Sequence, residues 1–260
     1  MSGGAVGVER EKPTPKARVR VLDTLRGFSI LSMVLYHGMF DLVYMFGVDL
    51  PWYRGWPGYL WQQSICWVFI LVSGASLHYG RHTLKRGLVV LGCGLLVSLV
   101  TAVGMPSQAI WFGILHFMGA AMLLSLPLRP LLKKVPVWGG AAACFALFLF
   151  TKGVPYGFLG IADHPLLTLP EVLYSTPFLF PLGLQNAAFS SGDYFPLIPW
   201  FFLFLTGWFI WAGLKDKAPR STKRPGPLGF LGRHSLLIYM LHQPVLYGLF
   251  WLLNLAGVFS

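Results

Sequence analysis

Apolar runs long enough to cross a lipid bilayer recur along almost the whole chain. Because a hydrocarbon core of about 30 Å needs about 20 apolar residues in a helix, these runs predict membrane-spanning helices rather than a soluble core. Only 11% of the 260 residues are charged, which fits this interpretation. We therefore expect an all-α polytopic bundle of about seven transmembrane helices, at residues 22–46, 58–79, 86–104, 108–128, 136–151, 195–213 and 231–256. The expected domains are a basic cytoplasmic tail at 1–20 and one transmembrane domain at 21–260.

The basic residues predict how the bundle is oriented. Of the 20 Lys and Arg residues, 17 precede the first expected helix or follow the second, fourth and sixth. By the positive-inside rule, these connections and the N-terminus are cytoplasmic and the C-terminus is extracytoplasmic. The net charge of +11 is then explained by the orientation of the chain in the membrane, which argues against a nucleic-acid partner. The first 20 residues lack the apolar core of a cleavable signal peptide, so the first helix is expected to act as the insertion signal.

Two connections are unusual. The cytoplasmic segment 214–229 is rich in Pro, Gly and charge and predicts a flexible tether near anionic headgroups. Segment 152–194 is long and poor in Lys and Arg, so we expect a lid, a re-entrant segment or a surface helix.

Ionisable residues inside the apolar runs are candidates for function, because each costs about 2.5–3.5 kcal/mol on insertion scales. The stretch "LDTLRGFSILSMVLYHGMFD" places Arg26 one turn inside the first helix and His37 eleven residues, or roughly 16 Å, farther along it. His116 and His242 fall at a similar depth in the fourth and seventh helices. We predict that the three histidines converge on one layer.

Each candidate also has a purely structural interpretation. Asp41 follows His37 by one helical turn and either holds its imidazole or faces water at the outer interface. Asp23 either forms a structural ion pair with Arg26 or helps to bind an anion. His116 and His242 are equally well explained as helix-packing histidines, and small residues such as Ser73 as packing residues.

The residue pattern argues against metal and disulfide sites. Three histidines on separate helices without a close carboxylate make a weak ligand set, so no metal is expected. The three cysteines lie in apolar runs without paired spacing and indicate neither a disulfide framework nor a zinc site.

Several motifs together resemble a known family. The opening stretch, with ten residues between Arg26 and His37, resembles the first-helix signature of the transmembrane acyltransferase superfamily. "FILVSGASL", "IWFGILHFMG", "DYFPLIPWFFLFLTG" and "GRHSLLIYMLHQPVL" are similar to the bacterial branch related to the catalytic domain of heparan-alpha-glucosaminide N-acetyltransferase. The resemblance implies transfer of an acyl group, usually acetyl from cytosolic acetyl-CoA, to a hydroxyl or amine of a glycan or glycolipid-type acceptor. It implies a place in the bacterial inner membrane, with His37 and Arg26 as the catalytic histidine and arginine.

A mechanism follows as a hypothesis. His37, aided by Asp41, removes the acceptor proton, and histidine suits this role because its pKa lies near neutrality. The hydrogen-bond donors that stabilise the tetrahedral oxyanion are expected to come from His116, His242, Tyr239 or Ser73. We expect the CoA nucleotide at the basic cytoplasmic face, near Arg26, Asp23, Arg81, Arg86 and Arg233, with Ser73 beside its arm. The acceptor is expected at Asp193, Tyr194, Tyr239 and Gln243. Whether His37 is itself transiently acylated is left open, as is assembly into a homo-oligomer.

Two other classes of function compete with the enzyme. Buried His, Asp and Arg residues also form proton relays in transporters, so a proton-coupled small-molecule transporter is the alternative. A transporter predicts polar residues along a continuous path rather than in one layer. A scaffold subunit would tolerate loss of His37. A retinal-type receptor is disfavoured because the last expected helix contains no lysine.

Overall fold

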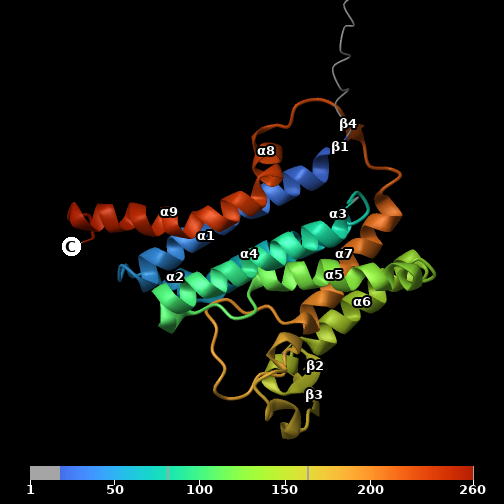
Figure 1. Ribbon diagram of the computed structural model, residues 1–260, viewed down its shortest axis with the longest axis horizontal. Coiled ribbons are helices and arrows are strands. Elements are labelled where there is room, and N and C mark those ends of the chain that lie inside the picture. The colour runs from blue at the N-terminus through green and yellow to red at the C-terminus, as the bar shows by residue number, and fades with distance from the viewer. Residues whose placement is uncertain (1–17, 81, 163, 260) are drawn as a thin grey trace, which may run out of the picture.

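The protein is an all-α helix bundle, as predicted. The computed structural model describes residues 18–80, 82–162 and 164–259. Within them, the long helices are α1 (Arg20–Tyr44), α3 (Trp56–Ser76), α4 (Thr83–Gly104), α5 (Ile114–Leu132), α6 (Val137–Thr151), α7 (Leu197–Leu214) and α9 (Ser235–Leu255). Two short helices, α2 (Pro51–Arg54) and α8 (Pro227–Arg233), join them. Figure 1 shows α1 and α9 side by side, with α4 against α5 and α6 against α7.

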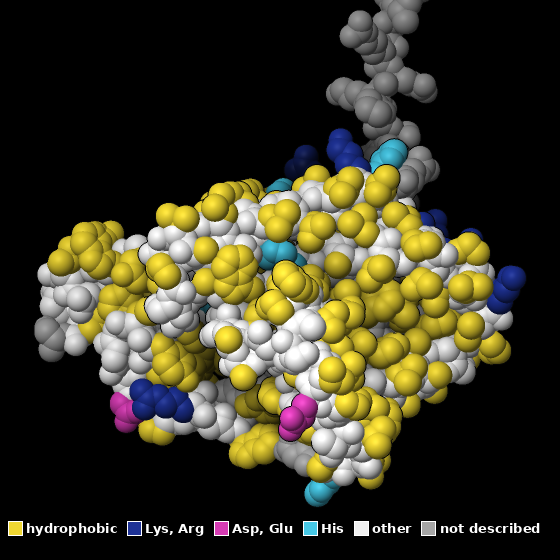
Figure 2. Space-filling model, turned by 60° about the horizontal axis from the view of Figure 1, so that its bottom comes forward, with side chains coloured by type: hydrophobic (Ala, Val, Ile, Leu, Met, Phe, Trp, Pro, Cys, Tyr) yellow, Lys and Arg dark blue, Asp and Glu magenta, His cyan; other side chains and the backbone are white. Residues whose placement is uncertain are grey.

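Six of the described long helices are long and apolar enough to span a membrane, counting α6 together with the turn that follows it. The helix left out is α3, which has 21 residues but includes Gln62, Gln63 and several tryptophans. It is nevertheless packed between α1 and α7. The fold therefore shows a polytopic membrane protein. That it has seven transmembrane helices remains a prediction. Figure 2 shows apolar side chains spread over the flank of the bundle and charged ones at its edges.

Two expected helices differ from those observed. The run 231–256 is divided at His234 into α8 and α9, since the backbone of His234 is not helical. The run expected at 108–128 begins as a helix only at Ile114, because Pro106–Gln108 form a separate 3₁₀ turn. Both differences lie at connections between helices. The residues there are still apolar, so hydropathy does not show where the helix ends.

The described residues of segment 152–194 form no α-helix, so the expected surface helix is absent from them, whereas a lid or a re-entrant segment stays a prediction. The segment contains an antiparallel hairpin of β2 (Phe158–Ile161) and β3 (His164–Thr168), followed by 3₁₀ turns at Glu171–Tyr174 and Phe180–Leu182. Gly160 and Pro165 lie opposite each other in the two strands. Since Gly and Pro normally count against a strand, the sequence pattern did not reveal the hairpin. Figure 1 shows it projecting from the end of α6.

The expected flexible tether at 214–229 is partly ordered. Its residues Arg220–Ser221 form β4, which pairs with β1 (Arg18–Val19) just before α1. α8 begins at Pro227 and packs on α1. The linker thus brings the start of α9 back to the start of α1.

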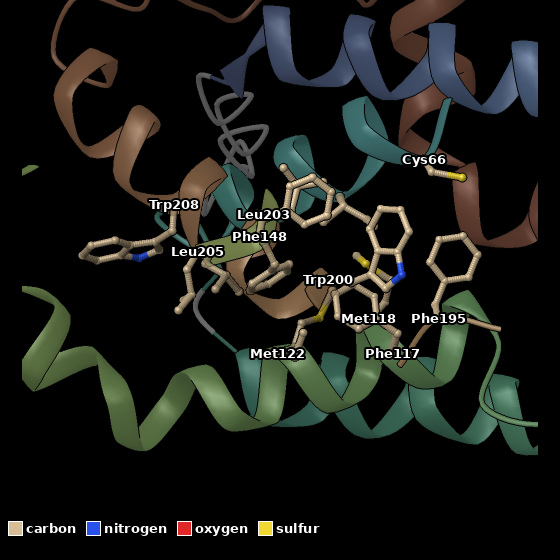
Figure 3. Close-up of a cluster of buried hydrophobic side chains, with 14 of the residues drawn as sticks. Cys66, Phe117, Met118, Met122, Phe148, Phe195, Trp200, Leu203, Leu205 and Trp208 are labelled. Atoms are coloured by element: carbon tan, nitrogen blue, oxygen red, sulfur yellow. The ribbon is translucent and has the colours of Figure 1, made fainter. Parts of the chain in front are cut away.

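The largest core cluster lies among α3, α5, α6 and α7. Phe117, Phe148, Leu203 and Phe204 are fully buried there, and Figure 3 shows Trp200 and Phe195 beside them. Close helix contact underlies this core: a Cβ atom on Gly74 of α3 would lie 1.9 Å from the carbonyl oxygen of Phe204 in α7. Only glycine permits backbones to approach so closely.

The basic clusters of different connections meet at one end of the bundle. Arg129 at the end of α5 donates to Thr83 Oγ1 at the start of α4, at 2.7 Å. Burial lowers the pKa of His78, which follows α3, and the nearby cations Lys215 and Arg129 act in the same direction. The predicted cytoplasmic face requires the basic connections to lie at the same end of the bundle, and these contacts place them there. Which side of the membrane this end occupies remains a prediction.

Candidate functional site

An arginine-rich cluster forms where α1 begins. Asp23 lies 3.4 Å from Arg26 Nη1, 3.3 Å from Arg233 Nε and 3.7 Å from Arg18 Nη1. Arg26 also donates from Nη2 to Ser76 Oγ at the end of α3, at 2.5 Å. One carboxylate therefore faces three guanidinium groups, and the cluster keeps a net positive charge. Asp23 is therefore the ion-pair partner of these arginines. Of its two interpretations from the sequence, this is the structural ion pair.

An open groove adjoins this cluster. It has a volume of about 530 Å³ and is lined by Arg20, Val21, Thr24 and residues 226–229. A smaller depression beside it is also lined by Asp23 and Arg233. Arg86 is close enough to Arg26 for their charges to interact. Arg81, also predicted to bind the nucleotide, lies outside the described residues.

Farther along α1, His37 meets His242 of α9. Their ring centroids are 4.9 Å apart and the ring planes meet at 66°, in an edge-to-face contact. His242 is 9% exposed and its Nδ1 lies 2.6 Å from the carbonyl oxygen of Tyr239. Because a carbonyl oxygen only accepts hydrogen bonds, Nδ1 carries the proton in the neutral ring and Nε2 holds the lone pair.

Asp41 does not form the expected hydrogen-bonded dyad with His37. Its Oδ1 accepts a hydrogen bond from Gln243 Nε2 of α9 at 2.6 Å. Asp41 is also 0% exposed, so it does not face water at the outer interface as the alternative interpretation supposed. The polar pair Asp41–Gln243 thus lies beside the pair His37–His242, and both pairs join α1 to α9.

His116 is placed apart from these two pairs. Its Nε2 is 3.2 Å from Ser98 Oγ of α4, and its ring stacks on Phe112. A Cβ on Gly94 would lie 3.0 Å from His116 Nδ1, so α4 packs directly on the imidazole. Among the described residues, no ring contact links His116 to His37 or His242. Of the three histidines predicted to converge, His37 and His242 are therefore in contact. His116 packs at the contact of α5 with α4.

Asp193 ties the loop before α7 to the start of α5. Its Oδ2 accepts a hydrogen bond from the Ile114 N–H at 2.9 Å and so caps the first turn of α5. Burial raises the pKa of Asp193 to about 6, although the Ile114 hydrogen bond acts in the opposite direction. The neighbouring Tyr194 hydroxyl donates to the Phe180 carbonyl at 2.5 Å and lies 3.0 Å from Gln185 Oε1. Two of the four residues predicted to bind the acyl acceptor, Asp193 and Tyr194, thus hold the loop that precedes α7.

The remaining predicted residues lie between these layers. Ser73 is 6% exposed in α3, next to Gly74 at the contact with α7. Tyr239 packs where the core cluster of α3, α5 and α7 meets that of α1. Within the described part of the chain, no group of three or more His, Cys, Asp or Glu side chains is arranged to hold a metal ion.

Comparison with known families agrees with the motifs. Residues 18–244 match the family described as heparan-alpha-glucosaminide N-acetyltransferase, catalytic. The chain belongs to this family. Neither the search of curated proteins nor the search of solved structures gave a match. The family implies acetyltransferase activity in a membrane enzyme, and the matched range includes every predicted site residue.

Two side chains that hydrogen-bond to predicted site residues were not predicted from the sequence. Ser76 binds Arg26, and Ser98 binds His116. A small polar residue inside an apolar run was the available signal for Ser98. It was not decisive, since such residues also serve simple helix packing.

Proposed function

We propose that the protein is a membrane-embedded acyltransferase that moves an acetyl group from cytosolic acetyl-CoA to a hydroxyl or amine of a glycan or glycolipid-type acceptor. The observation that carries this proposal is the contact between half-buried His37 of α1 and buried His242 of α9, whose ring centroids are 4.9 Å apart. Acyl transfer needs a group that accepts a proton near neutral pH, and imidazole is the side chain suited to it. The family match supports the reaction class.

The arginine-rich cluster supports a donor site at the predicted cytoplasmic face. Arg18, Arg26 and Arg233 share the single carboxylate of Asp23, so positive charge is left for phosphate groups. His37 lies eleven residues beyond Arg26 on α1, roughly 16 Å along the helix axis. A donor whose nucleotide stays in the groove would extend its pantetheine arm along α1 toward the histidines.

The proposed chemistry balances without a further reactant. The lone pair of the acceptor nitrogen or oxygen forms a bond to the thioester carbonyl carbon, and a histidine takes the proton as the N–H or O–H bond breaks. The tetrahedral intermediate then collapses, the C–S bond breaks, and the proton passes to the departing CoA thiolate. The acceptor would approach from the opposite face, past the loop held by Asp193 and Tyr194. We place the enzyme in a bacterial inner membrane with its C-terminus outside.

The test is incubation of purified protein with radiolabelled acetyl-CoA and membrane glycans or lipids. We expect the wild type to transfer label and the double variant His37→Ala/His242→Ala to lose about 10²–10⁴-fold in rate, which is the usual contribution of general base catalysis. His82→Ala is the matched control, because His82 is exposed at the start of α4. A second double variant, His37→Gln/His242→Gln, keeps polar side chains at both positions and guards against misfolding.

Three outcomes would contradict the proposal. Folded wild type that neither binds nor consumes acetyl-CoA would exclude the donor, and movement of an unmodified solute across vesicles would favour the transporter. Activity retained by both double variants would exclude the histidine pair. Label trapped on the protein would instead indicate an acyl-histidine intermediate.

A further inference from the structure

Three polar atoms between α1 and α9 have no hydrogen-bond partner among the described residues. They are Asp41 Oδ2, Gln243 Oε1 and His242 Nε2. Asp41 is 0% exposed and His242 is 9% exposed. Leaving a buried polar group unpaired costs about 1–3 kcal/mol, so three such atoms in one cluster need an explanation.

The three atoms share one chemical character. Asp41 Oδ2 is a carboxylate oxygen and Gln243 Oε1 an amide oxygen, because the amide nitrogen of Gln243 already donates to Asp41 Oδ1. His242 Nε2 carries a lone pair, because Nδ1 donates to the Tyr239 carbonyl. All three are therefore hydrogen-bond acceptors. A complementary ligand must supply donors only.

We propose that these three atoms form the subsite for the nucleophilic group of the acyl acceptor, and that His242 Nε2, rather than His37, takes its proton. The subsite fits a primary amine, or a hydroxyl with a neighbouring hydroxyl, because either presents two or more N–H or O–H donors. The inference rests on the proposed acyltransferase function and assigns its base. In the step, the acceptor's X–H bond breaks as its lone pair forms the bond to the acyl carbon. The proton passes to Nε2 and then to the CoA thiolate as the C–S bond breaks.

The surroundings of His242 support this role. Its tautomer is fixed by a carbonyl one helical turn earlier in the same helix, so Nε2 is held as the basic nitrogen. His242 is also the single buried residue of α9. The other residues of α9 are exposed or half-buried, and the helix packs mainly along α1, so His242 is the point at which α9 reaches into the bundle.

The first experiment needs no acetyl-CoA. Protein with ¹⁵N-labelled histidine is studied by solid-state NMR in lipid, with His242→Gln identifying the signal. We expect a neutral ring protonated at Nδ1, and an Nε2 signal that shifts when glucosamine, glucose, glycerol or ethanolamine is added at high concentration. His234 is the matched control, because its Nδ1 also contacts a backbone carbonyl, at 2.9 Å, while the residue is exposed. A ring protonated at Nε2, or no shift with any of the four probes, overturns the subsite.

The second experiment compares variants in binding and in turnover. Asp41→Asn replaces the Oδ2 acceptor by a donor, so we expect glucosamine to lose about tenfold more affinity than glucose, which is a change that a purely structural Asp41 would not produce. His242→Gln should remove the pH dependence of kcat/KM for the acceptor at its acidic limb, whereas His37→Gln should retain it. The reverse result overturns the assignment of the base. Probe binding without acetyl transfer would refute the proposed function and leave the subsite standing.

Discussion

Gly27 of α1 gives the sharpest test of how the donor end is built. A Cβ atom at this position would lie 1.8 Å from the carbonyl oxygen of Leu228 and 3.0 Å from the backbone nitrogen of Gly232, both in α8. These are backbone atoms, so no side-chain rotation relieves the clash. To restore an ordinary contact of 3.4 Å, α8 must retreat by about 1.6 Å. Since α8 ends at Arg233, the retreat also lengthens the contact with Asp23.

The expected loss of stability can be estimated from these contacts. Overpacking of this kind costs about 1–3 kcal/mol. Weakening the partly exposed pair Asp23–Arg233 adds up to about 1 kcal/mol. For a chain of this size, each kcal/mol lowers the melting temperature by about 2–4 °C. We therefore expect Gly27→Ala to melt roughly 2–16 °C below the wild type.

The assay is thermal unfolding in detergent of variants made in a Cys93→Ser/Cys144→Ser background, since these two thiols are half-buried. A thiol-reactive fluorescent dye then reports the buried Cys66, which it reaches only when the bundle opens. Gly92→Ala is the matched control, because Gly92 lies within α4 and a Cβ there would have no neighbour within 4 Å. It should be neutral or slightly stabilising, since alanine is the better helix former. If Gly27→Ala melts together with Gly92→Ala, the close packing of α8 on α1 is wrong.

Three further predictions follow from the same structure. Gly74→Ala should separate α3 from α7 and lower the melting temperature by a similar amount, because its Cβ would lie 1.9 Å from the Phe204 carbonyl; the same dye assay measures it, and an unchanged melting temperature would contradict the contact. Asp193 has a raised pKa of about 6, so its contribution to stability is complete below about pH 4 and is lost as the pH rises through 6. Melting curves from pH 4 to 8 should show this loss in the wild type and not in Asp193→Asn, and equal slopes would refute it. Arg233→Gln should raise the KM for acetyl-CoA about tenfold with little change in kcat, because it removes one charge-assisted contact; a changed kcat with constant KM would argue against a nucleotide-binding role.

Some of the site was predictable because it depends on position along one helix. The depth of His37 relative to Arg26 follows from a fixed rise per residue, and His242 falls at a matching depth by the same count. Depth alone, however, also placed His116 in this layer. His116 instead packs on Ser98, because α5 turns this face toward α4.

Hydrophobic length and the sign of nearby charges are local properties, and the sequence by itself therefore determined the all-α class, the approximate helix positions and the separation of basic from apolar segments. The partners of polar side chains are not local. They depend on how each helix is rotated and on which neighbour it packs against, which contacts such as Gly74 with Phe204 decide. Tertiary structure alone therefore paired Asp41 with Gln243 rather than His37, divided α8 from α9, and brought Arg233 to Asp23.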